Sequence, residues 1–193
     1  SKRIGFASYQ DLASLVYAGK IARLYTTFEI QKKSGGHRRI SAPIGVLRKA
    51  QHELAQILSQ NYPGRPSVHG FRRGRSIVTN AQQHLKKQIV LNLDLEDFFG
   101  SITFGRVRSL LQSKPFCVPY SVATVIAHLV CLNGKLPQGA PTSPVLSNMI
   151  CYRLDGELQE LAARSKSTYT RYCDDLTFSF SSNINRISND VFE

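Results

Sequence analysis

Apolar residues recur every three or four positions over several stretches of the chain, which predicts amphipathic helices. Near the start, Leu12, Leu15 and Val16 follow this spacing, with Ser8 placed to cap the helix and Gly19 to end it. A single long helix is expected in VLSNMICYRLDGELQELAAR, residues 145–164. Further helices are predicted over about 46–60, 76–87, 104–112 and 119–131, and in the final stretch 183–193.

Other stretches favour strands. The runs LYTTFEI and HRRISAP flank KKSGG, where two glycines indicate a hairpin with a basic tip. The segment QIVLNLDLEDFF, residues 88–99, is almost continuously apolar, which is typical of a buried central strand. A second strand pair is expected around RYCDDLTFS, residues 171–179. Together these elements predict an α/β (α+β) fold in which helices pack on an antiparallel sheet.

Positive charge is concentrated in the first half of the chain. Residues 1–88 carry 16 basic and 3 acidic side chains, whereas residues 89–193 carry 9 basic and 10 acidic ones. A basic lobe that binds a polyanion would explain this distribution, and a solvated surface rich in Lys and Arg is the alternative.

The composition of the chain also indicates where in the cell the protein is located. No apolar run approaches the roughly 20 residues that a membrane span needs, and the first residues show no signal-peptide pattern. The four cysteines form no CxxC pair, which favours reduced thiols over a zinc or redox site. We therefore expect a soluble, cytoplasmic protein with no membrane partner.

The sequence RYCDDLTFS places two carboxylates, Asp174 and Asp175, side by side between strand-forming runs. Like charges at this spacing repel unless a cation lies between them. Asp94 ends the strand VLNLD, where a ligand could reach it at the sheet edge. Three such carboxylates would supply hard oxygen ligands for Mg²⁺, and a pair of these ions is the usual machinery of phosphoryl transfer. The simpler alternatives are a helix cap at Asp94 and a solvated type I′ turn at the aspartate pair.

Three segments in order, LDLEDFFGSI, LPQGAPTSPVLSN and RYCDDLTFS, resemble the successive active-site motifs of reverse transcriptases. The upstream KKSGGHRRISAP, VHGFRRGRSI and NAQQH narrow the resemblance to bacterial retron-type enzymes, in which an NAxxH segment precedes the first catalytic aspartate. The likeness extends from about residue 24 to 181. It implies a right-hand polymerase with fingers over 1–88, a palm with an antiparallel sheet over 89–193, and a thumb that is absent from this chain.

The resemblance implies an RNA-directed DNA polymerase that transfers dNTPs onto a nucleic-acid primer with two Mg²⁺ ions. In the family the primer is the 2′-hydroxyl of a guanosine in a structured noncoding RNA, and the DNA product stays linked to RNA. An anti-phage role and an associated effector protein are implied in the same way. Alternatives are another bacterial reverse transcriptase, of the group II intron or phage-defence type, and a non-catalytic RNA-binding scaffold. Since family members continue past the catalytic hairpin, we expect the chain to be a fragment of a longer polypeptide.

By the same resemblance, Asp94, Asp174 and Asp175 are the catalytic, metal-binding carboxylates, and the backbone carbonyl of Leu95 is a further metal ligand. Phe99 would lie beneath the incoming sugar and exclude a 2′-hydroxyl, whereas its neighbour Phe98 fits an ordinary core position. The other nucleotide-binding residues would be Lys32, Arg38 (with Arg39 as its competitor), Asp97, Gln138 and Gly139.

For three further segments, the sequence allows both a functional and a purely structural interpretation. Arg72, Arg73 and Arg75 can follow the phosphates of template or structured RNA, or belong to a solvated loop. Asn80 and His84 lie one helical turn apart, where they can satisfy each other or a loop carbonyl, or contact RNA. PQGAPTSP can bring a backbone close to the nucleotide, or form a plain loop before a capped helix.

Overall fold

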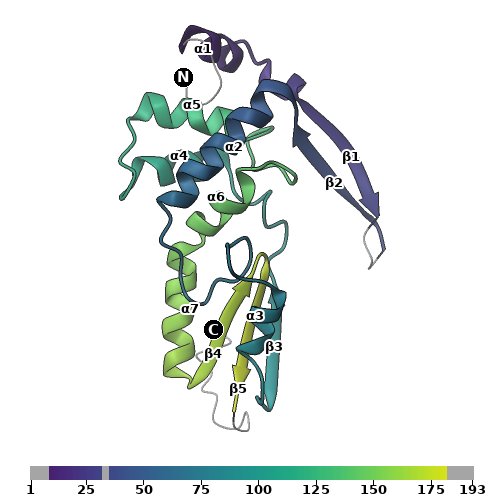
Figure 1. Ribbon diagram of the computed structural model, residues 1–193, viewed down its shortest axis with the longest axis vertical. Helices are drawn as coiled ribbons and strands as arrows, with labels where there is room; N and C mark the ends of the chain where they lie inside the picture. Colours follow the sequence, from purple (N-terminus) through teal and green to yellow (C-terminus); the bar gives the residue numbers. More distant parts are fainter. Residues whose placement is uncertain (1–8, 32–34, 182–193) are drawn as a thin grey trace. The chain divides into compact units, whose positions relative to one another are not determined.

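The computed structural model of the protein describes residues 9–31 and 35–181, so the predicted cap at Ser8 and the helix expected over 183–193 lie outside the described residues. The chain divides into two compact units, whose elements are labelled in Figure 1. The first unit is formed by residues 1–62 and 97–150, and the second by residues 63–96 and 151–193. Each unit is discontinuous in sequence. The functional division into fingers over 1–88 and a palm over 89–193 stays a prediction.

The first unit is mainly helical. Each helix buries one apolar face in a shared core, in which Leu47, Val107, Leu129 and Leu146 are fully buried. This packing supplies most of the stability that short helices lack on their own. The helices are α1 (Tyr9–Tyr17), η2 (Ile21–Leu24), α2 (Gly45–Gln60), α4 (Phe104–Gln112), α5 (Tyr120–Val130) and α6 (Ser143–Ile150).

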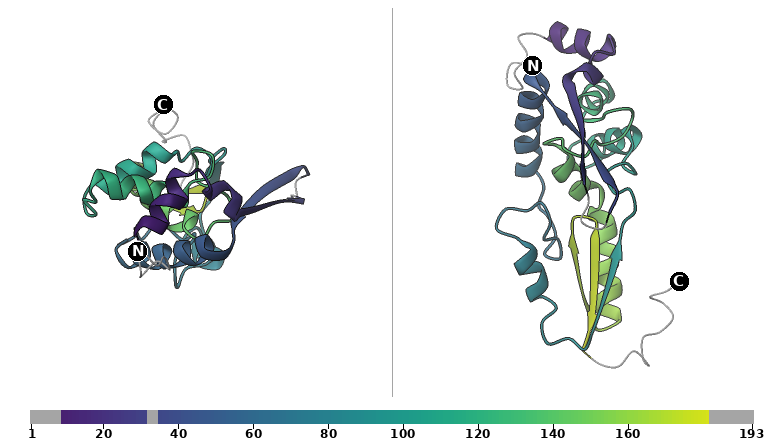
Figure 2. Two further views of the ribbon diagram at one scale, coloured as in Figure 1. Left: turned by 90° about the horizontal axis from the view of Figure 1, so that it is seen from above. Right: turned by 90° about the vertical axis from the view of Figure 1, so that its right-hand side faces the viewer.

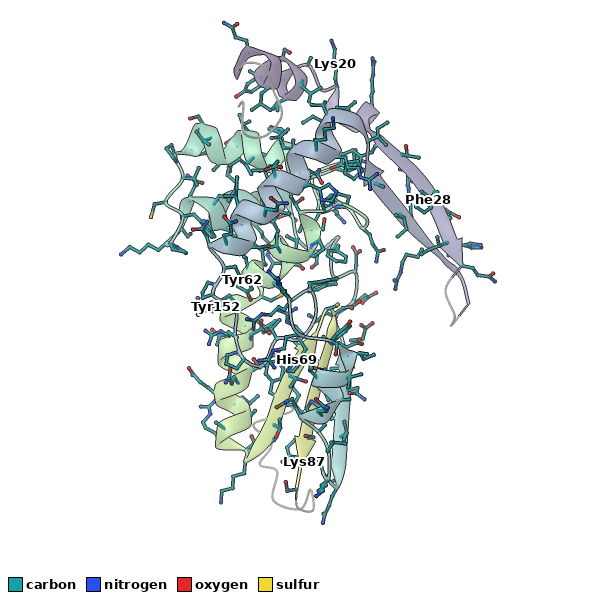
Figure 3. All side chains as sticks on the ribbon, viewed as in Figure 1. Lys20, Phe28, Tyr62, His69, Lys87 and Tyr152 are labelled. Atoms are coloured by element: carbon teal, nitrogen blue, oxygen red, sulfur yellow. The ribbon has the colours of Figure 1, made fainter. Side chains whose placement is uncertain are left out.

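A two-stranded antiparallel hairpin extends from the helices of this unit (Figure 1), and it confirms the strand pair expected around KKSGG. β1 (Tyr25–Gln31) pairs with β2 (His37–Pro43) along its whole length. Most side chains of the hairpin are exposed. Phe28, labelled in Figure 3, has an exposed fraction of 48%. The hairpin is tied to the core through Gln51, whose buried amide donates hydrogen bonds to the Tyr25 hydroxyl and the Leu129 carbonyl at 2.7 Å each.

The second unit is a three-stranded antiparallel sheet with a helix on each face (Figure 2). The strands β3 (Ile89–Asp94), β4 (Ser167–Tyr172) and β5 (Asp175–Phe180) lie in the order β3-β5-β4. α7 (Tyr152–Arg164) covers the apolar face, which is formed around Leu176, Phe178 and Phe180 of β5. α3 (Ile77–Gln82) lies on the opposite face, where hydroxyl side chains of β4 and β5 alternate with the apolar ones. Mixed helices and antiparallel sheet are thus confirmed.

The expectation that residues 88–99 form a buried central strand is wrong. β3 ends at Asp94 and lies at an edge of the described sheet, and Val90 and Leu93 are nearly half exposed. The central strand is β5, in which Leu176–Phe180 are all buried. A run of apolar letters does not distinguish a strand buried on two faces from one that buries a single face.

Two predicted helices are shorter than expected. The helix over 76–87 ends at Gln82, and the following residues form turns up to Lys86, which has a φ of +59°. The helix over 145–164 is interrupted at Cys151, which separates α6 from α7. The two halves contribute to different cores, because Leu146 and Met149 pack in the first unit and Leu158 and Ala162 in the second.

Candidate active site

Two predicted catalytic carboxylates occupy paired positions in the sheet of the second unit. Asp94 is the last residue of β3 and Asp175 the first of β5, and they are direct partners in the antiparallel register. Opposed residues of such a pair project from the same face of the sheet. Just beyond the strand, the amide of Leu95 donates a hydrogen bond of 3.1 Å to the carbonyl of Asp174. The structure therefore gathers all four residues expected to bind metal at one end of the sheet.

The charges of this group act on one another. Partial burial, followed by the charges of Asp174 and Asp94, raises the pKa of Asp175 above its ordinary value. A carboxylate whose charged form is disfavoured by its neighbours gains most from a cation placed among them. The electrostatics thus favour a cation at this end of the sheet.

The chemical nature of these ligands fits a hard divalent cation. Three carboxylates and a backbone carbonyl are the oxygen ligands that Mg²⁺ prefers. Within residues 9–31 and 35–181, no group of three His, Cys, Asp or Glu side chains already converges closely enough to hold an ion. The side chains of Asp94, Asp174 and Asp175 would therefore have to turn toward the ion when it binds.

The hairpin turn that carries the adjacent aspartates has an unusual backbone. Tyr172 pairs with Asp175, so Cys173 and Asp174 form a two-residue turn. Cys173, at the first position of the turn, has a φ of +60°, whereas the φ of Asp174, at the second position, is not positive. This combination of φ signs is that of a type II′ turn, since a type I′ turn has a positive φ at both positions. Glycine is usual at the first position of such a turn. A residue with a side chain at this position adds conformational strain of about 1–3 kcal/mol to the folded state. Burial raises the pKa of Cys173 to about 11, so its thiol stays neutral.

The turn is packed against an upstream loop. His69 donates its backbone N–H to the Arg171 carbonyl at 2.8 Å, and Arg171 donates its own to the Ser67 carbonyl at 2.9 Å. This parallel bridge brings Gly70 against Cys173, where any Cβ on Gly70 would overlap the Cys173 backbone nitrogen. The glycine of the VHG sequence is therefore required by the close approach of the Cys173–Asp174 turn.

Arg171 and Asp155 were not singled out by the sequence analysis, although both are fully buried beside this turn. Arg171 occupies the same face of β4 as Tyr169, and Asp155 lies on the buried face of α7. The sequence did contain a signal for this pair. Arg171 falls where the two-residue period of a strand places an apolar residue, and Asp155 falls where the helical period places one. Opposite charges in two such positions predict a buried ion pair.

His84 of the NAQQH segment has both ring nitrogens occupied by the sheet. Nδ1 lies 2.7 Å from the Ser179 hydroxyl and Nε2 lies 2.7 Å from the Thr170 hydroxyl. Burial, and then the charge of Lys87, lowers the pKa of His84, so the neutral ring is favoured. His84 therefore joins the turn after α3 to β4 and β5. Among the described residues, the buried side-chain carbonyl oxygen of Asn80 has no hydrogen-bond partner.

The arginines of the upstream loop differ in their surroundings. Arg72 donates a hydrogen bond to the carbonyl of Arg65 and is half buried. Arg65 in turn lies over the ring of Tyr152, with its guanidinium carbon 4.1 Å from the ring centre. Arg73 and Arg75 are exposed. Both therefore remain available for phosphates, whereas Arg72 also has a structural contact.

The first unit holds the predicted nucleotide-binding residues that the structure describes. The carbonyl of Gln138 accepts a hydrogen bond from the Ser41 amide of β2 at 2.7 Å. Gly139 has a φ of +113°, and a Cβ there would lie 2.7 Å from a methyl carbon of Ile40. Its lack of a side chain thus lets the loop pack on β2. Ser143 donates to the Pro137 carbonyl at 2.7 Å, so it bonds within the PQGAPTSP loop that precedes it.

The cations of the hairpin are only partly described. Lys32 lies outside the described residues. Arg38 is exposed on β2 and faces Ile30 across the strands, whereas Arg39 faces Glu29. The acidic neighbour offsets the charge of Arg39, which favours Arg38 as the more effective phosphate ligand.

The two adjacent phenylalanines that follow Asp94 in the sequence have different environments. Phe98 is 6% exposed, as expected for a core residue. Phe99 is half buried, with its ring centre 5.2 Å from that of Phe98. Asp97 has a φ of +44° and lies 3.8 Å from the Lys135 ammonium, with both side chains exposed. Phe99 and Asp97 therefore keep surface that a ligand can contact.

Comparison with known proteins gives consistent matches. The sequence pattern of the family described as reverse transcriptase (RNA-dependent DNA polymerase) matches residues 30–191. The retron Mx65 reverse transcriptase of Myxococcus xanthus is 43% identical over 175 residues, which cover 81% of this chain and 40% of that protein. The retron Ec86 reverse transcriptase of Escherichia coli is 34% identical over 174 residues, which cover 89% of this chain and 53% of that protein. The chain thus spans about half or less of the length of these relatives.

None of the helices in the described part of the chain combines the length and the apolar character needed to cross a bilayer.

Proposed function

The chain belongs to the reverse transcriptase family, and we propose that it forms the fingers and palm of a retron-type, RNA-directed DNA polymerase. The observation that carries this proposal is the pairing of Asp94 with Asp175, beside Asp174, at the end of the sheet in the second unit. Carboxylates placed together in this way are costly unless they bind cations. A protein that only bound RNA would gain nothing from them.

Asp94, Asp174, Asp175 and the carbonyl of Leu95 would hold two Mg²⁺ ions. When bound, such ions activate the attacking hydroxyl and stabilise the leaving pyrophosphate. The protein's own contribution is to fix the backbone of these residues at one end of the sheet, so that only their side chains have to turn when metal and nucleotide arrive. The neutral thiol of Cys173 adds no further charge to this group.

The remaining residues would bind and select the substrates. Arg38 and Lys32 would hold the triphosphate, because cations neutralise the charge that develops on its oxygens. Asp97 would lie beside the nucleotide, but its carboxylate takes no part in this neutralisation. Phe99 would contact the sugar and leave no room or hydrogen-bond partner for a 2′-hydroxyl. The segment Gln138–Gly139 would contact the base pair being formed. Arg72, Arg73 and Arg75 would follow the RNA backbone.

The expected partners are an RNA template, which in this class is part of a structured noncoding RNA, dNTPs and the DNA product that remains linked to RNA. A role in anti-phage defence with an effector protein, and a cytoplasmic location, belong to the same proposal. They are supported by the likeness to retron reverse transcriptases.

Primer extension by the full-length protein tests the function. A primer annealed to an RNA template is incubated with single dNTPs or ribonucleotides, with Mg²⁺ or with a chelator. We expect the deoxynucleotide complementary to the template to be added in the presence of Mg²⁺, and ribonucleotides to be added poorly. Absence of any incorporation, or incorporation that ignores the template, would contradict the proposal.

A further inference from the structure

A fully buried ion pair lies directly behind the turn that carries Asp174 and Asp175. The guanidinium of Arg171 donates from Nε and Nη2 to the two carboxylate oxygens of Asp155, at 2.8 Å each. Both side chains are 0% exposed. The Tyr169 hydroxyl donates a further hydrogen bond of 2.9 Å to the same carboxylate. Asp155 is therefore saturated with donors, and the guanidinium is fixed in one orientation.

This orientation directs a third donor of Arg171 at the catalytic turn. Nη1 donates a hydrogen bond of 2.8 Å to the carbonyl of Cys173, the residue with the positive φ. The peptide group that contains this carbonyl also contains the amide nitrogen of Asp174. The hydrogen bond thus fixes the plane of the peptide that leads into the first aspartate of the pair.

The opposite side of the turn is also restrained. The backbone of Arg171 is bonded to Ser67 and His69, and Gly70 packs on the backbone nitrogen of Cys173. The turn is consequently held between a buried guanidinium and a loop. Within residues 9–31 and 35–181, by contrast, the carboxylates of Asp174 and Asp175 make no hydrogen bond or ion pair, so their placement depends on the backbone that carries them.

Stability alone does not account for the pair. Burial disfavours the charge on Arg171, and the hydrogen bonds and charge of Asp155 outweigh this effect, so the pKa of the guanidinium lies above its ordinary value. Even so, apolar residues of similar volume are often as stable as a buried ion pair in the same position. What apolar residues cannot supply is a donor for the carbonyl of Cys173.

We propose that Arg171, oriented by Asp155, is a positioning residue that holds the strained Cys173–Asp174 turn so that the backbone of the two aspartates stays beside Asp94 before metal binds. The proposal rests on the proposed function, because it assigns these residues a role in nucleotidyl transfer. Arg171 touches neither substrate nor the reacting atoms. Its effect is exerted through one backbone carbonyl.

Two variants of the full-length protein separate positioning from stability. The double variant D155L/R171M replaces the ion pair with apolar side chains and leaves no buried charge without a partner. Arg171→Lys keeps one positive charge beside Asp155 but lacks the planar fork that reaches Asp155 and the Cys173 carbonyl together. Arg153→Lys is the matched control, because Arg153 forms an exposed pair with Glu157 on the same helix.

Three measurements are made on each protein: the melting temperature, the kinetics of primer extension (kcat and KM for a dNTP), and the affinity for Mn²⁺ by electron paramagnetic resonance. The resonance experiment uses a primer that ends in a dideoxynucleotide, together with the next dNTP. We expect D155L/R171M to melt near the wild-type temperature, with kcat lower by about tenfold or more and Mn²⁺ affinity lower by a similar factor. KM for the dNTP should change by less than about twofold.

Arg171→Lys should show the same loss of kcat and Mn²⁺ affinity, and Arg153→Lys should match the wild type in all three measurements. Wild-type kcat and Mn²⁺ affinity in a folded D155L/R171M would overturn the proposal, as would wild-type values in Arg171→Lys if the double variant does not fold. The wild-type protein separates this result from the proposed function. If it fails to extend a primer, the proposed function is wrong, whereas an active wild type with active variants contradicts only the role of Arg171.

Discussion

Phe98 and Phe99 show how adjacent residues of one type receive different roles from their surroundings. Phe98 is buried, so its ring contributes to packing, whereas Phe99 keeps accessible surface. A ring that is held against its neighbour but still exposed can contact a ligand without being free to move away. The same reasoning separates the exposed Arg73 and Arg75 from Arg72, which is bonded to the Arg65 carbonyl.

Replacing Phe99 with Val should therefore alter substrate choice and leave stability almost unchanged. We expect the preference for dNTPs over ribonucleotides, measured as the ratio of their kcat/KM values, to fall about tenfold or more, because a smaller side chain leaves room for the 2′-hydroxyl. Phe98→Val is the matched control. It should lower the free energy of unfolding by about 2 kcal/mol or more and keep the preference. An unchanged preference in Phe99→Val would remove Phe99 from this role.

At the scale of elements, the segment after α3 is held by side chains rather than by helical hydrogen bonds. His84 bridges the hydroxyls of Thr170 and Ser179 on two neighbouring strands. The helix consequently ends at Gln82, although the residues that follow would tolerate a longer helix. These contacts place the segment on the face of the sheet opposite α7.

This bridge should make part of the stability depend on pH. Burial and Lys87 lower the pKa of His84, so the unfolded chain takes up a proton at a higher pH than the folded one. The contribution of the neutral ring is therefore complete above its ordinary pKa of about 6.5, and it is lost as the pH falls toward the lower folded value. At pH 7.5 we expect His84→Gln to cost about 1–3 kcal/mol of unfolding free energy.

Denaturant unfolding at pH 7.5 and 5.5 measures this effect. The difference between wild type and His84→Gln should shrink at the lower pH, whereas His52→Gln, at an exposed position of α2, should differ from wild type by the same small amount at both values. A difference for His84→Gln that stays constant, or grows on acidification, would contradict the account of this bridge.

The sequence predicted which helices and strands exist better than it predicted where they end and how they are ordered in the sheet. The helices over 46–60, 104–112 and 119–131 and the two hairpins agree with the structure, because each has a clear apolar face and local end signals. The position of β3 at a sheet edge depends on strand order, which no local pattern contains. The early end of α3 depends on hydroxyls of strands about 90 residues away. Likewise, the three aspartates were predicted as a group, whereas Arg171 and Asp155 needed the packing of α7 on β4 to be recognised.

For the molecule as a whole, the most consequential property is the uneven distribution of charge. The excess of basic residues in 1–88 suits a polyanion, and part of it lies on the exposed Arg73 and Arg75 of the second unit. Each contact between a basic side chain and a phosphate releases counterions from the RNA. The loss of one such contact therefore weakens both the affinity for RNA and the dependence of that affinity on salt.

Replacing Arg73 and Arg75 together with Glu should weaken binding of the template RNA by about tenfold or more at physiological salt. The slope of log affinity against log salt should also fall by about one to two units. Arg164→Glu, an exposed arginine on α7, is the matched control and should change neither quantity by more than about twofold. An unchanged salt slope in the double variant would show that these two residues do not contact RNA phosphates.

Asp174 is expected to belong to the group that performs nucleotidyl transfer, and single-turnover incorporation of one deoxynucleotide on an RNA template tests this role. The rate is compared between wild type, Asp174→Asn and Glu157→Gln, in which an exposed carboxylate of α7 loses its charge. We expect Asp174→Asn to lower the rate by a factor on the order of 10² or more with RNA affinity unchanged, and Glu157→Gln to keep it. A rate for Asp174→Asn within about twofold of the wild type would contradict the account.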